Sequence, residues 1–330
     1  MMPGTTERVS ATHPAPQVFE HFRARFGDVL RSPTDGEALH ASPDGSALLT
    51  PSDRKAAAVR EGVIDFVSPQ ADDRGDEKGF AFQWNNILAG NLSDKIVYNN
   101  TRASLLQSVL HPLGLTPEWF KGRTFVDLGS GHGQYVRAFA GVGAKALGVD
   151  LSEVVYRCTH EDRAINPDLD TTYIRGDLLD LPLLPRSFDC VISIGVSNTT
   201  PDARKACIEA AKRVKAGGYF MFYNYEKGAV GYVNVRERLP FLTKLPRPLL
   251  LWVCRAMAVP LAFYLTGRHG KLPTLQTFRT GALGLFDAIE PRYCWTCTPE
   301  TILSWLNDPA AGLSDVRRVA PCFYTARGKL

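Results

Sequence analysis

Three acidic residues and a glycine-rich turn are the groups in this sequence best suited to binding a charged ligand. The stretch "VDLGSGHGQ" places Asp127 directly before glycines at positions 129, 131 and 133. Glycines at this spacing let the backbone turn tightly and let a ligand approach it closely. Two further acidic residues, Asp150 in "GVDLS" and Asp177 in "RGDLLDLP", follow along the chain. A carboxylate before the turn repels phosphate and attracts an ammonium group, so these residues indicate a ligand with a positive charge.

The spacing of the glycines argues against two common phosphate-binding turns. A dinucleotide-binding fingerprint requires a glycine at position 134, where this chain has Gln134. A P-loop requires Gly-Lys-Ser/Thr, but the first basic residue after the turn is Arg137. A dehydrogenase and a P-loop enzyme are therefore both disfavoured.

The other two acidic residues suggest what the ligand contains. Asp150 lies 21 residues after Gly129, where an acidic side chain at the end of a second strand can bind both hydroxyls of a ribose. Asp177 can accept a hydrogen bond from an adenine amino group, with Leu151 and Leu178 beside the ring. S-adenosylmethionine combines an adenine, a free ribose and an ammonium group without a phosphate.

These residues fall at the ends of regularly alternating elements. Between residues 124 and 225, apolar strands alternate with amphipathic helices, which predicts right-handed βαβ units and a parallel sheet covered on both faces. Ligands bind such sheets at the carboxyl ends of the strands. We therefore predict an α/β, Rossmann-like fold with a seven-stranded, mostly parallel sheet. A small N-terminal β unit precedes it, and a helical cap is inserted after the fifth strand.

The same segments resemble class I S-adenosylmethionine-dependent methyltransferases of the type 11-like group. The matching stretches occur in family order over about one hundred residues: "VDLGSGHGQ", "GVDLS", "GDLLDLP", "FDCVISIGVSNTTP" and "AAKRVKAGGYFMFYNY". The resemblance implies S-adenosylmethionine as cofactor and a set of cofactor-binding residues: Asp127, Gly129, Gly131, Gly133, Gln134, Asp150, Leu151, Asp177, Leu178, Gly195, Trp84 and Tyr98. Trp84 and Tyr98 could face the sulfonium or could equally be core residues.

Methyl transfer requires few catalytic side chains, because the sulfonium already activates the methyl group and the protein mainly aligns the reactants. The candidates are His132, Asn198 and Tyr223, and His132 could instead only pack within its loop. Relatives often have histidines where this chain has Asn198 and Thr199, so an acid/base role for that loop is in doubt. The N/D-P-P-Y motif of amine and amide methylation is missing. Oxygen or carbon is therefore favoured over nitrogen as the acceptor atom.

The N-terminal region resembles a zinc ribbon that has lost its cysteines. The prolyl turns "SPTD" and "TPSD" keep the ribbon's spacing, but the ligand positions are Ser32, Asp35, Thr50 and Asp53. Oxygen ligands in this arrangement make a poor zinc site, so we predict a metal-free β unit for structure or docking. An unrelated turn-rich segment is the alternative.

Composition limits the choice of compartment and partners. A net charge of +4 is small for a nucleic-acid binder, so no nucleic-acid partner is expected. The seven cysteines are odd in number and scattered, which indicates reduced thiols and a cytoplasmic protein. "CWTC" at 294–297 has the spacing of half a zinc site, but core or site-lining thiols are the better interpretation. The N-terminus lacks the apolar core of a signal peptide.

Residues 226–292 provide the evidence on the substrate. They carry ten Lys or Arg against four Asp or Glu around an apolar run of about eighteen residues. Arg255 and Pro260 interrupt this run and argue against a membrane span. Amphipathic helices that line a pocket for an apolar metabolite, or that contact a membrane surface through 246–265, fit better. A solvated lid is the remaining interpretation.

Four regions follow from this reading. We expect a leader and degenerate ribbon at 1–77, a methyltransferase core at 78–225, a cap at 226–292, and a helix and strands that complete the sheet at 293–330. The expected function is methylation of a small molecule, such as a secondary metabolite, a quinone or a lipid-like compound. The alternatives are a tRNA or protein methyltransferase and a non-catalytic S-adenosylmethionine-binding partner or sensor. The oligomeric state is left open.

Overall fold

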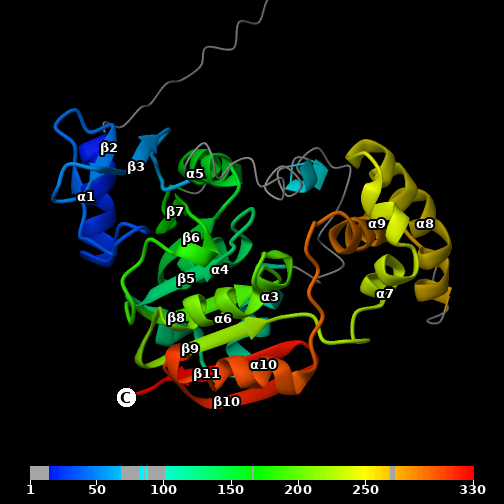
Figure 1. The fold of residues 1–330 in the computed structure, drawn as a ribbon. Helices are drawn as coiled ribbons and strands as arrows, with labels where there is room; N and C mark the ends of the chain where they lie inside the picture. Colours follow the sequence, from blue (N-terminus) through cyan, green and yellow to red (C-terminus); the bar gives the residue numbers. More distant parts are fainter. Residues whose placement is uncertain (1–14, 68–81, 85, 88–100, 166, 268–271) are drawn as a thin grey trace, which may run out of the picture.

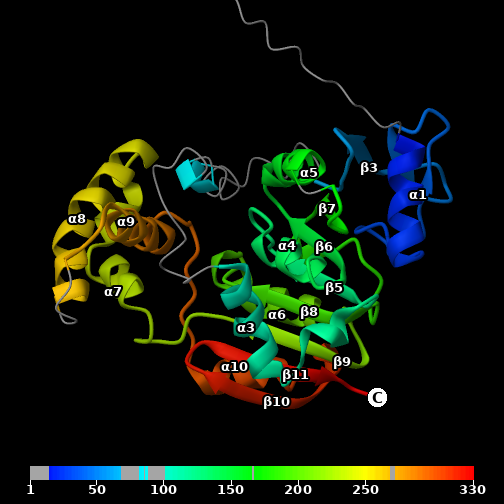
Figure 2. The same cartoon turned by 180° about the vertical axis from the view of Figure 1, so that it is seen from behind.

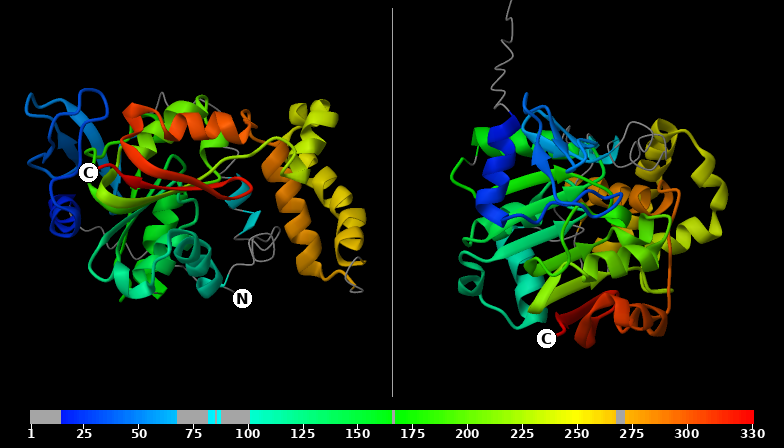
Figure 3. Two further views of the ribbon diagram at one scale, coloured as in Figure 1. Left: turned by 90° about the horizontal axis from the view of Figure 1, so that it is seen from below. Right: turned by 60° about the vertical axis from the view of Figure 1, so that its left-hand side comes forward.

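The computed structural model describes residues 15–67, 82–84, 86–87, 101–165, 167–267 and 272–330. One mixed sheet runs through the molecule with helices on both faces (Figures 1 and 3). Its strand order is β1-β2-β3-β4-β7-β6-β5-β8-β9-β11-β10. The core strands are β5 (Thr124–Leu128), β6 (Lys145–Asp150), β7 (Thr171–Arg175), β8 (Phe188–Ile194), β9 (Val214–Tyr223), β10 (Leu313–Ala320) and β11 (Phe323–Gly328). Strands β5 to β9 pair in parallel, and the β10–β11 hairpin pairs antiparallel with β9. The predicted seven-stranded, mostly parallel core is confirmed.

Alternation along each strand creates two apolar cores, one on each face of the sheet. In β5, Val126 and Leu128 belong to one core and Phe125 to the other. The first core also takes residues from α1 (Ala15–Phe26), α6 (Ala203–Ala211) and α10 (Pro299–Leu306). The second takes residues from α3 (Arg102–Leu113), α4 (Gln134–Ala140) and α5 (Val154–Ile165). Helix α3 is capped at its C-terminal end by Gly114, which takes a φ of 65°.

The N-terminal β unit extends the main sheet instead of forming a separate module. Its strands are β1 (His40–Ala41), β2 (Ala47–Leu49), β3 (Lys55–Arg60) and β4 (Val63–Asp65). Strand β4 pairs in parallel with β7 through Ile64 and Ile174, so the sheet has eleven strands. The predicted β unit is present, but the expected strand count applies only to the core.

Three oxygen-bearing positions of the ribbon-like turns, Ser32, Asp35 and Thr50, make side-chain contacts within the protein. Arg54 pairs with the Asp35 carboxylate and donates to Ser32 Oγ at 3.3 Å. Thr50 Oγ1 is hydrogen-bonded to Ser52 Oγ at 2.9 Å. A guanidinium therefore links the two turns, and the origin of this unit from a zinc ribbon stays a prediction.

The cap is a helical layer beyond the carboxyl ends of the strands (Figure 2). It contains α7 (Gly231–Arg238), the 3₁₀ turn η5 (Pro240–Lys244), α8 (Arg247–Gly267) and α9 (Leu275–Ile289). A third apolar core, centred on Leu250, Cys254 and Phe286, holds α8 against α9. Four other 3₁₀ turns are described: η2 (Pro117–Phe120), η3 (Leu178–Asp180), η4 (Ser197–Thr199) and η6 (Pro309–Ala311).

Candidate active site

A cavity of about 570 Å³ lies between the carboxyl ends of β5 to β9 and the cap. Most of the predicted site residues line its wall: Trp84, Asp127, Gly129, Gly131, His132, Gln134, Asp150, Leu151, Asp177, Leu178, Gly195 and Tyr223. Gly133 and Asn198 are not part of the wall, and Tyr98 lies outside the described residues. The topology therefore gathers side chains that are up to 139 positions apart, from Trp84 to Tyr223, into one hollow.

The glycine turn needs glycine for two separate reasons. Gly129 and Gly131 have φ values of 88° and 50°, which side chains rarely tolerate. A Cβ atom on Gly129 would also lie 2.1 Å from Val196 Cγ2, and one on Gly131 would lie 2.6 Å from Trp84 Cζ2. The turn is therefore closely packed by Val196 and Trp84 as well as bent.

Gly133 lies where helix α4 begins and packs against the sheet. It precedes α4 with a φ of 79°, and a Cβ atom there would lie 2.4 Å from the Tyr173 hydroxyl oxygen. Its missing side chain makes room for Tyr173, which belongs to the second apolar core. Gly133 thus starts the helix and packs against the sheet, but it does not border the cavity.

Asp150 joins the first two strand-end loops. Its carboxylate accepts hydrogen bonds from Gly131 N at 2.8 Å, from Ser152 N at 2.9 Å and from Ser152 Oγ at 2.8 Å. Asp177 accepts from Leu179 N at 2.8 Å and so caps the short η3 turn. Both carboxylates border the cavity and are fixed by neighbouring backbone groups.

Asp127 is a buried acidic group on the sheet side of the site. Burial, with a contribution from the nearby Asp150 carboxylate, raises the pKa of Asp127 to about 8. A cation bound beside Asp127 would relieve both effects. An ammonium group at the predicted position would therefore stabilise the charged form of Asp127.

The three catalytic candidates are placed differently. The His132 ring packs against Trp84, with 4.6 Å between ring centroids, at the cavity wall. Burial raises the pKa of Tyr223, which also borders the cavity. Asn198 is fully buried in η4 away from the wall, and its side-chain amide has no hydrogen-bond partner among the described residues. Trp84 and His132 both border the cavity, and Trp84 also packs against the second apolar core.

The cap contributes a polar cluster that the sequence analysis did not identify. Asp287 of α9 accepts hydrogen bonds from Gln83 Nε2 at 3.1 Å and from the Tyr225 hydroxyl at 3.3 Å. Burial raises the pKa of Asp287 despite these two bonds. The other wall residues on this side are mainly apolar: Val230, Tyr232, Leu283, Gly284 and Phe323. One signal was available, because Asp287 is the sole acidic residue between positions 238 and 289.

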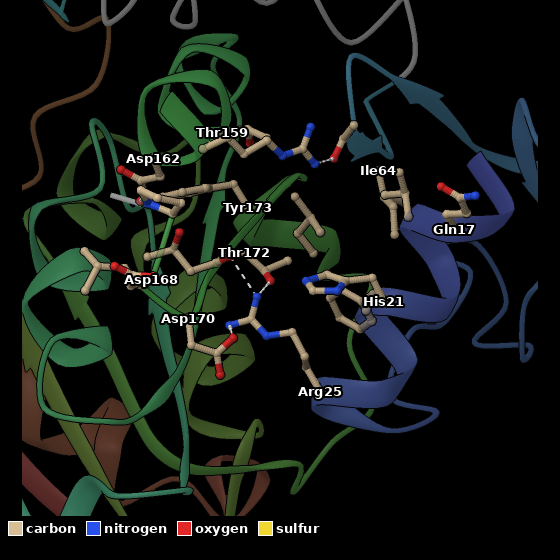
Figure 4. A pocket seen from close by; sticks show the side chains of 18 residues that line it. Gln17, His21, Arg25, Ile64, Thr159, Asp162, Asp168, Asp170, Thr172 and Tyr173 are labelled. Atoms are coloured by element: carbon tan, nitrogen blue, oxygen red, sulfur yellow. Dashed lines mark hydrogen bonds and ion pairs between the residues drawn. The ribbon is translucent and has the colours of Figure 1, made fainter. Parts of the chain in front are cut away.

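A second cavity, of about 540 Å³, lies beneath α1 beside β7 and the end of α5 (Figure 4). Two of its charged groups, Arg25 and Asp162, are in ion pairs within the protein. Arg25 binds the Thr171 carbonyl at 2.7 Å, the Thr172 hydroxyl and the Asp170 carboxylate. Asp162 binds Arg137 and accepts from the Tyr173 hydroxyl at 2.8 Å. This cavity lies at the packing interface between α1 and the sheet.

Comparison with known proteins assigns a family to the segment that supplies the sheet side of the first cavity. The sequence profile described as "Methyltransferase domain" matches residues 126–222, from β5 through most of β9. This segment is a class I, S-adenosylmethionine-dependent methyltransferase domain. The domain supplies β5 to β9 and the loops that carry the glycine turn, Asp150 and Asp177.

Similar proteins share the methyltransferase domain but little beyond it. An uncharacterised methyltransferase of Mycobacteroides abscessus is 31% identical over 98 residues, which are 30% of this chain and 38% of that protein. A ubiquinone biosynthesis O-methyltransferase of Thiobacillus denitrificans is 28% identical over 133 residues, which are 38% of this chain and 53% of that protein. The chain thus spans about half or less of these relatives.

Among solved structures, magnesium protoporphyrin IX methyltransferase from Synechocystis, with bound SAH, is similar to this chain. It is 17% identical with a TM-score of 0.43, over 77% of this chain and 94% of that one.

The cofactor of the methyltransferase domain is S-adenosylmethionine, which supplies a methyl group on a positively charged sulfur. The cavity fits this donor on two observations. Asp127 is a buried carboxylate whose raised pKa a cation would lower. Gly129, Gly131 and Asp150 border the same cavity as Asp127. The residues that would hold the donor are Asp127, Asp150 and the glycine turn.

Proposed function

We propose that this chain transfers a methyl group from S-adenosylmethionine to an oxygen or carbon atom of an apolar small molecule. One observation carries the proposal: a single cavity has Asp127 and Asp150 on the sheet side and Asp287 among apolar cap residues on the other. The acceptors that fit include a secondary metabolite, a quinone or a lipid-like compound with a hydroxyl group.

On the sheet side, the protein holds and orients the donor. Asp150 is fixed by Gly131 N and Ser152, so its carboxylate is positioned to take the ribose hydroxyls. Asp127 would pair with the ammonium group of the donor, and the glycine turn borders the same cavity. These contacts provide the alignment on which an in-line displacement depends.

On the cap side, the protein orients the acceptor and excludes water. Tyr232 and Leu283 provide apolar wall, and Gly284 leaves room for the Tyr232 ring, which would lie 2.6 Å from a Cβ atom there. Asp287 is held by Gln83 and Tyr225, and its oxygens can also accept a hydrogen bond from an acceptor hydroxyl. Because its pKa is raised, Asp287 is a better proton acceptor than an ordinary carboxylate.

The choice of oxygen as the first acceptor atom has support from outside this chain. Two of the similar proteins are named ubiquinone biosynthesis O-methyltransferases. A carboxylate beside an apolar wall suits a phenol or enol, whose proton must leave when the new bond forms. The absence of an N/D-P-P-Y motif is in agreement with this choice.

Binding of the donor can be tested first. Asp150→Ala should weaken binding of S-adenosylmethionine at least a hundredfold in calorimetry, because the turn loses its anchor and the ribose loses its acceptor. Asp168→Ala, in the wall of the second cavity, is the matched control and should bind like the wild type. Unchanged affinity in the Asp150 variant would remove the ribose assignment.

Turnover then tests the acceptor. Release of S-adenosylhomocysteine would be followed with octyl 3,4-dihydroxybenzoate and with 3,4-dihydroxybenzoic acid, which lacks the apolar tail. We expect a higher kcat/KM for the ester. Asp287→Asn should keep the donor affinity and lower kcat about 10²- to 10⁴-fold, the range for loss of a general base. Methylation of tRNA or a protein but no phenol would overturn the proposal, as would donor binding without any turnover.

A further inference from the structure

Helix α8 carries apolar side chains on two opposite faces, yet only one of these faces is buried. One stripe packs against α9: Leu250, Cys254, Ala258 and Ala262. The opposite stripe, at helical spacing, faces outward: Leu249, Trp252, Ala256, Val259 and Phe263. A helix that is hydrophobic on opposite faces is normally enclosed by protein or lipid. Figures 1 and 2 show α8 on the side of the cap farthest from the sheet.

The outward stripe forms a large exposed apolar surface with its neighbours. Trp252 is 69% exposed, Tyr264 61%, Phe263 52%, and Phe241 of η5 59%. We call this surface, with Leu249 and Val259, the outer face of the cap. Apolar patches of this kind mark interaction sites on soluble proteins. Aromatic side chains dominate it, as at membrane–water interfaces.

The charge around the outer face of the cap has one sign. Residues 239–286 contain six Lys or Arg and no Asp or Glu over 48 positions. Lys244 and Arg255 are exposed on the elements that form the outer face. A nearby carboxylate, Glu290 of the adjoining turn, is paired with Arg247 at 2.6 Å. The surface is therefore apolar and basic, and it complements an anionic apolar partner.

These observations select a lipid surface over a second copy of the chain. A symmetric dimer through the outer face would bring two basic faces together, which electrostatics opposes. Among the described residues, Arg247–Tyr264 is the one helical stretch with the length and hydropathy of a membrane span. However, Arg255 and Pro260 lie within it, and one stripe is packed against α9. Its geometry is that of a helix lying in the plane of an interface.

We propose that the outer face of the cap binds the surface of an anionic lipid bilayer, with α8 parallel to the membrane. Trp252, Phe263 and Tyr264 enter the boundary between headgroups and acyl chains. Lys244 and Arg255 contact the lipid phosphates. The proposal does not depend on the identity of the methyl acceptor, because the outer face lies on α8 and η5 and not on the cavity wall.

Vesicle co-sedimentation of the full chain tests this proposal. Binding should be strong to phosphatidylcholine vesicles with 30% phosphatidylglycerol and weak to pure phosphatidylcholine. It should also fall as salt is raised, since the charges at the surface are screened. Lys244→Gln and Arg255→Gln should each lower the partition coefficient on anionic vesicles about fivefold, the usual contribution of one basic residue.

The apolar contribution has its own variant and control. Trp252→Glu/Phe263→Glu should lower binding to anionic vesicles at least tenfold. Leu184→Glu/Val319→Glu changes two exposed apolar residues outside the cap in the same way and should bind like the wild type. Both proteins should keep the wild-type affinity for S-adenosylmethionine, which shows that they are folded.

Three results would overturn the proposal. The cap double variant could bind anionic vesicles as well as the wild type. The control variant could lose binding equally. Light scattering could show a wild-type dimer that the cap double variant dissociates, which would assign the face to contact between two copies.

Discussion

The two cavities are nearly equal in size, about 570 and about 540 Å³, but their charged groups are used in opposite ways. In the cavity below the cap, burial raises the pKa values of Asp127 and Asp287. The nearby Asp150 carboxylate adds to the shift of Asp127, and the hydrogen bonds from Gln83 and Tyr225 only partly offset that of Asp287. In the cavity beneath α1, Arg25 is paired with Asp170, and Asp162 is paired with Arg137. Volume therefore does not identify the ligand site. The ligand site is instead identified by buried carboxylates that have no cationic partner in the described part of the protein.

The largest expected difference between the cavities concerns their glycines. Gly129→Ala would place a methyl group 2.1 Å from Val196 at a φ of 88°, so the turn must shift. Affinity for S-adenosylmethionine should fall more than a hundredfold in calorimetry. Gly62→Ala is the matched change in the second cavity, where the φ is 78° and the added Cβ meets the flexible end of Arg163 at 2.4 Å.

We expect the Gly62 variant to lose about 1 kcal/mol of unfolding free energy and to bind the donor normally. Equal loss of donor affinity in both variants would mean that the glycines act through general stability. The distinction between the two cavities would then fail.

A smaller effect should separate the cavities by pH. The pKa of Asp127 is about 8 without ligand, and a bound ammonium group would lower it. Binding therefore releases a proton, so affinity should rise between pH 6 and pH 8, by up to about tenfold per unit. Above pH 8 the Asp127 contribution is complete. Calorimetry in buffers of different ionisation enthalpy measures the released proton directly.

Asp127→Asn is the control for this pH dependence. The variant should bind S-adenosylmethionine about tenfold more weakly at pH 8, since a charge-assisted interaction is lost. Its affinity should be nearly flat between pH 6 and pH 8. A variant that retained the wild-type slope would show that a group other than Asp127 takes up the proton.

The sheet side of the site was predictable because it is built from local patterns. A strand followed by a glycine turn, and a second strand that ends in Asp150, fix their own positions once the strands pair in parallel. The cap side was not predictable in this way. Gln83 and Asp287 are 204 positions apart and meet only because α9 folds back over the cavity.

The extension of the sheet shows the same limit. The resemblance of the N-terminal region to a ribbon predicts a β unit, but the partner of β4 depends on the free edge of β7, more than one hundred positions further on. Gly133 shows the same limit of sequence-based prediction for a single residue. Its place in the turn suggested contact with a ligand, whereas Tyr173, from a strand 40 positions away, occupies the space beside it.

Replacement of Arg25 should affect the second cavity alone. Arg25→Met keeps an aliphatic side chain but removes the guanidinium, which binds Thr171, Thr172 and Asp170 and lies over the Phe26 ring. Asp170 is half exposed and can be solvated, so the loss of unfolding free energy should be modest, about 1–2 kcal/mol by urea denaturation. Affinity for S-adenosylmethionine should not change, since Arg25 fastens α1 to β7 far from the donor. A change in affinity without a change in stability would show that the contact between α1 and β7 affects donor binding. The contrast between a binding cavity and a structural one would then no longer hold.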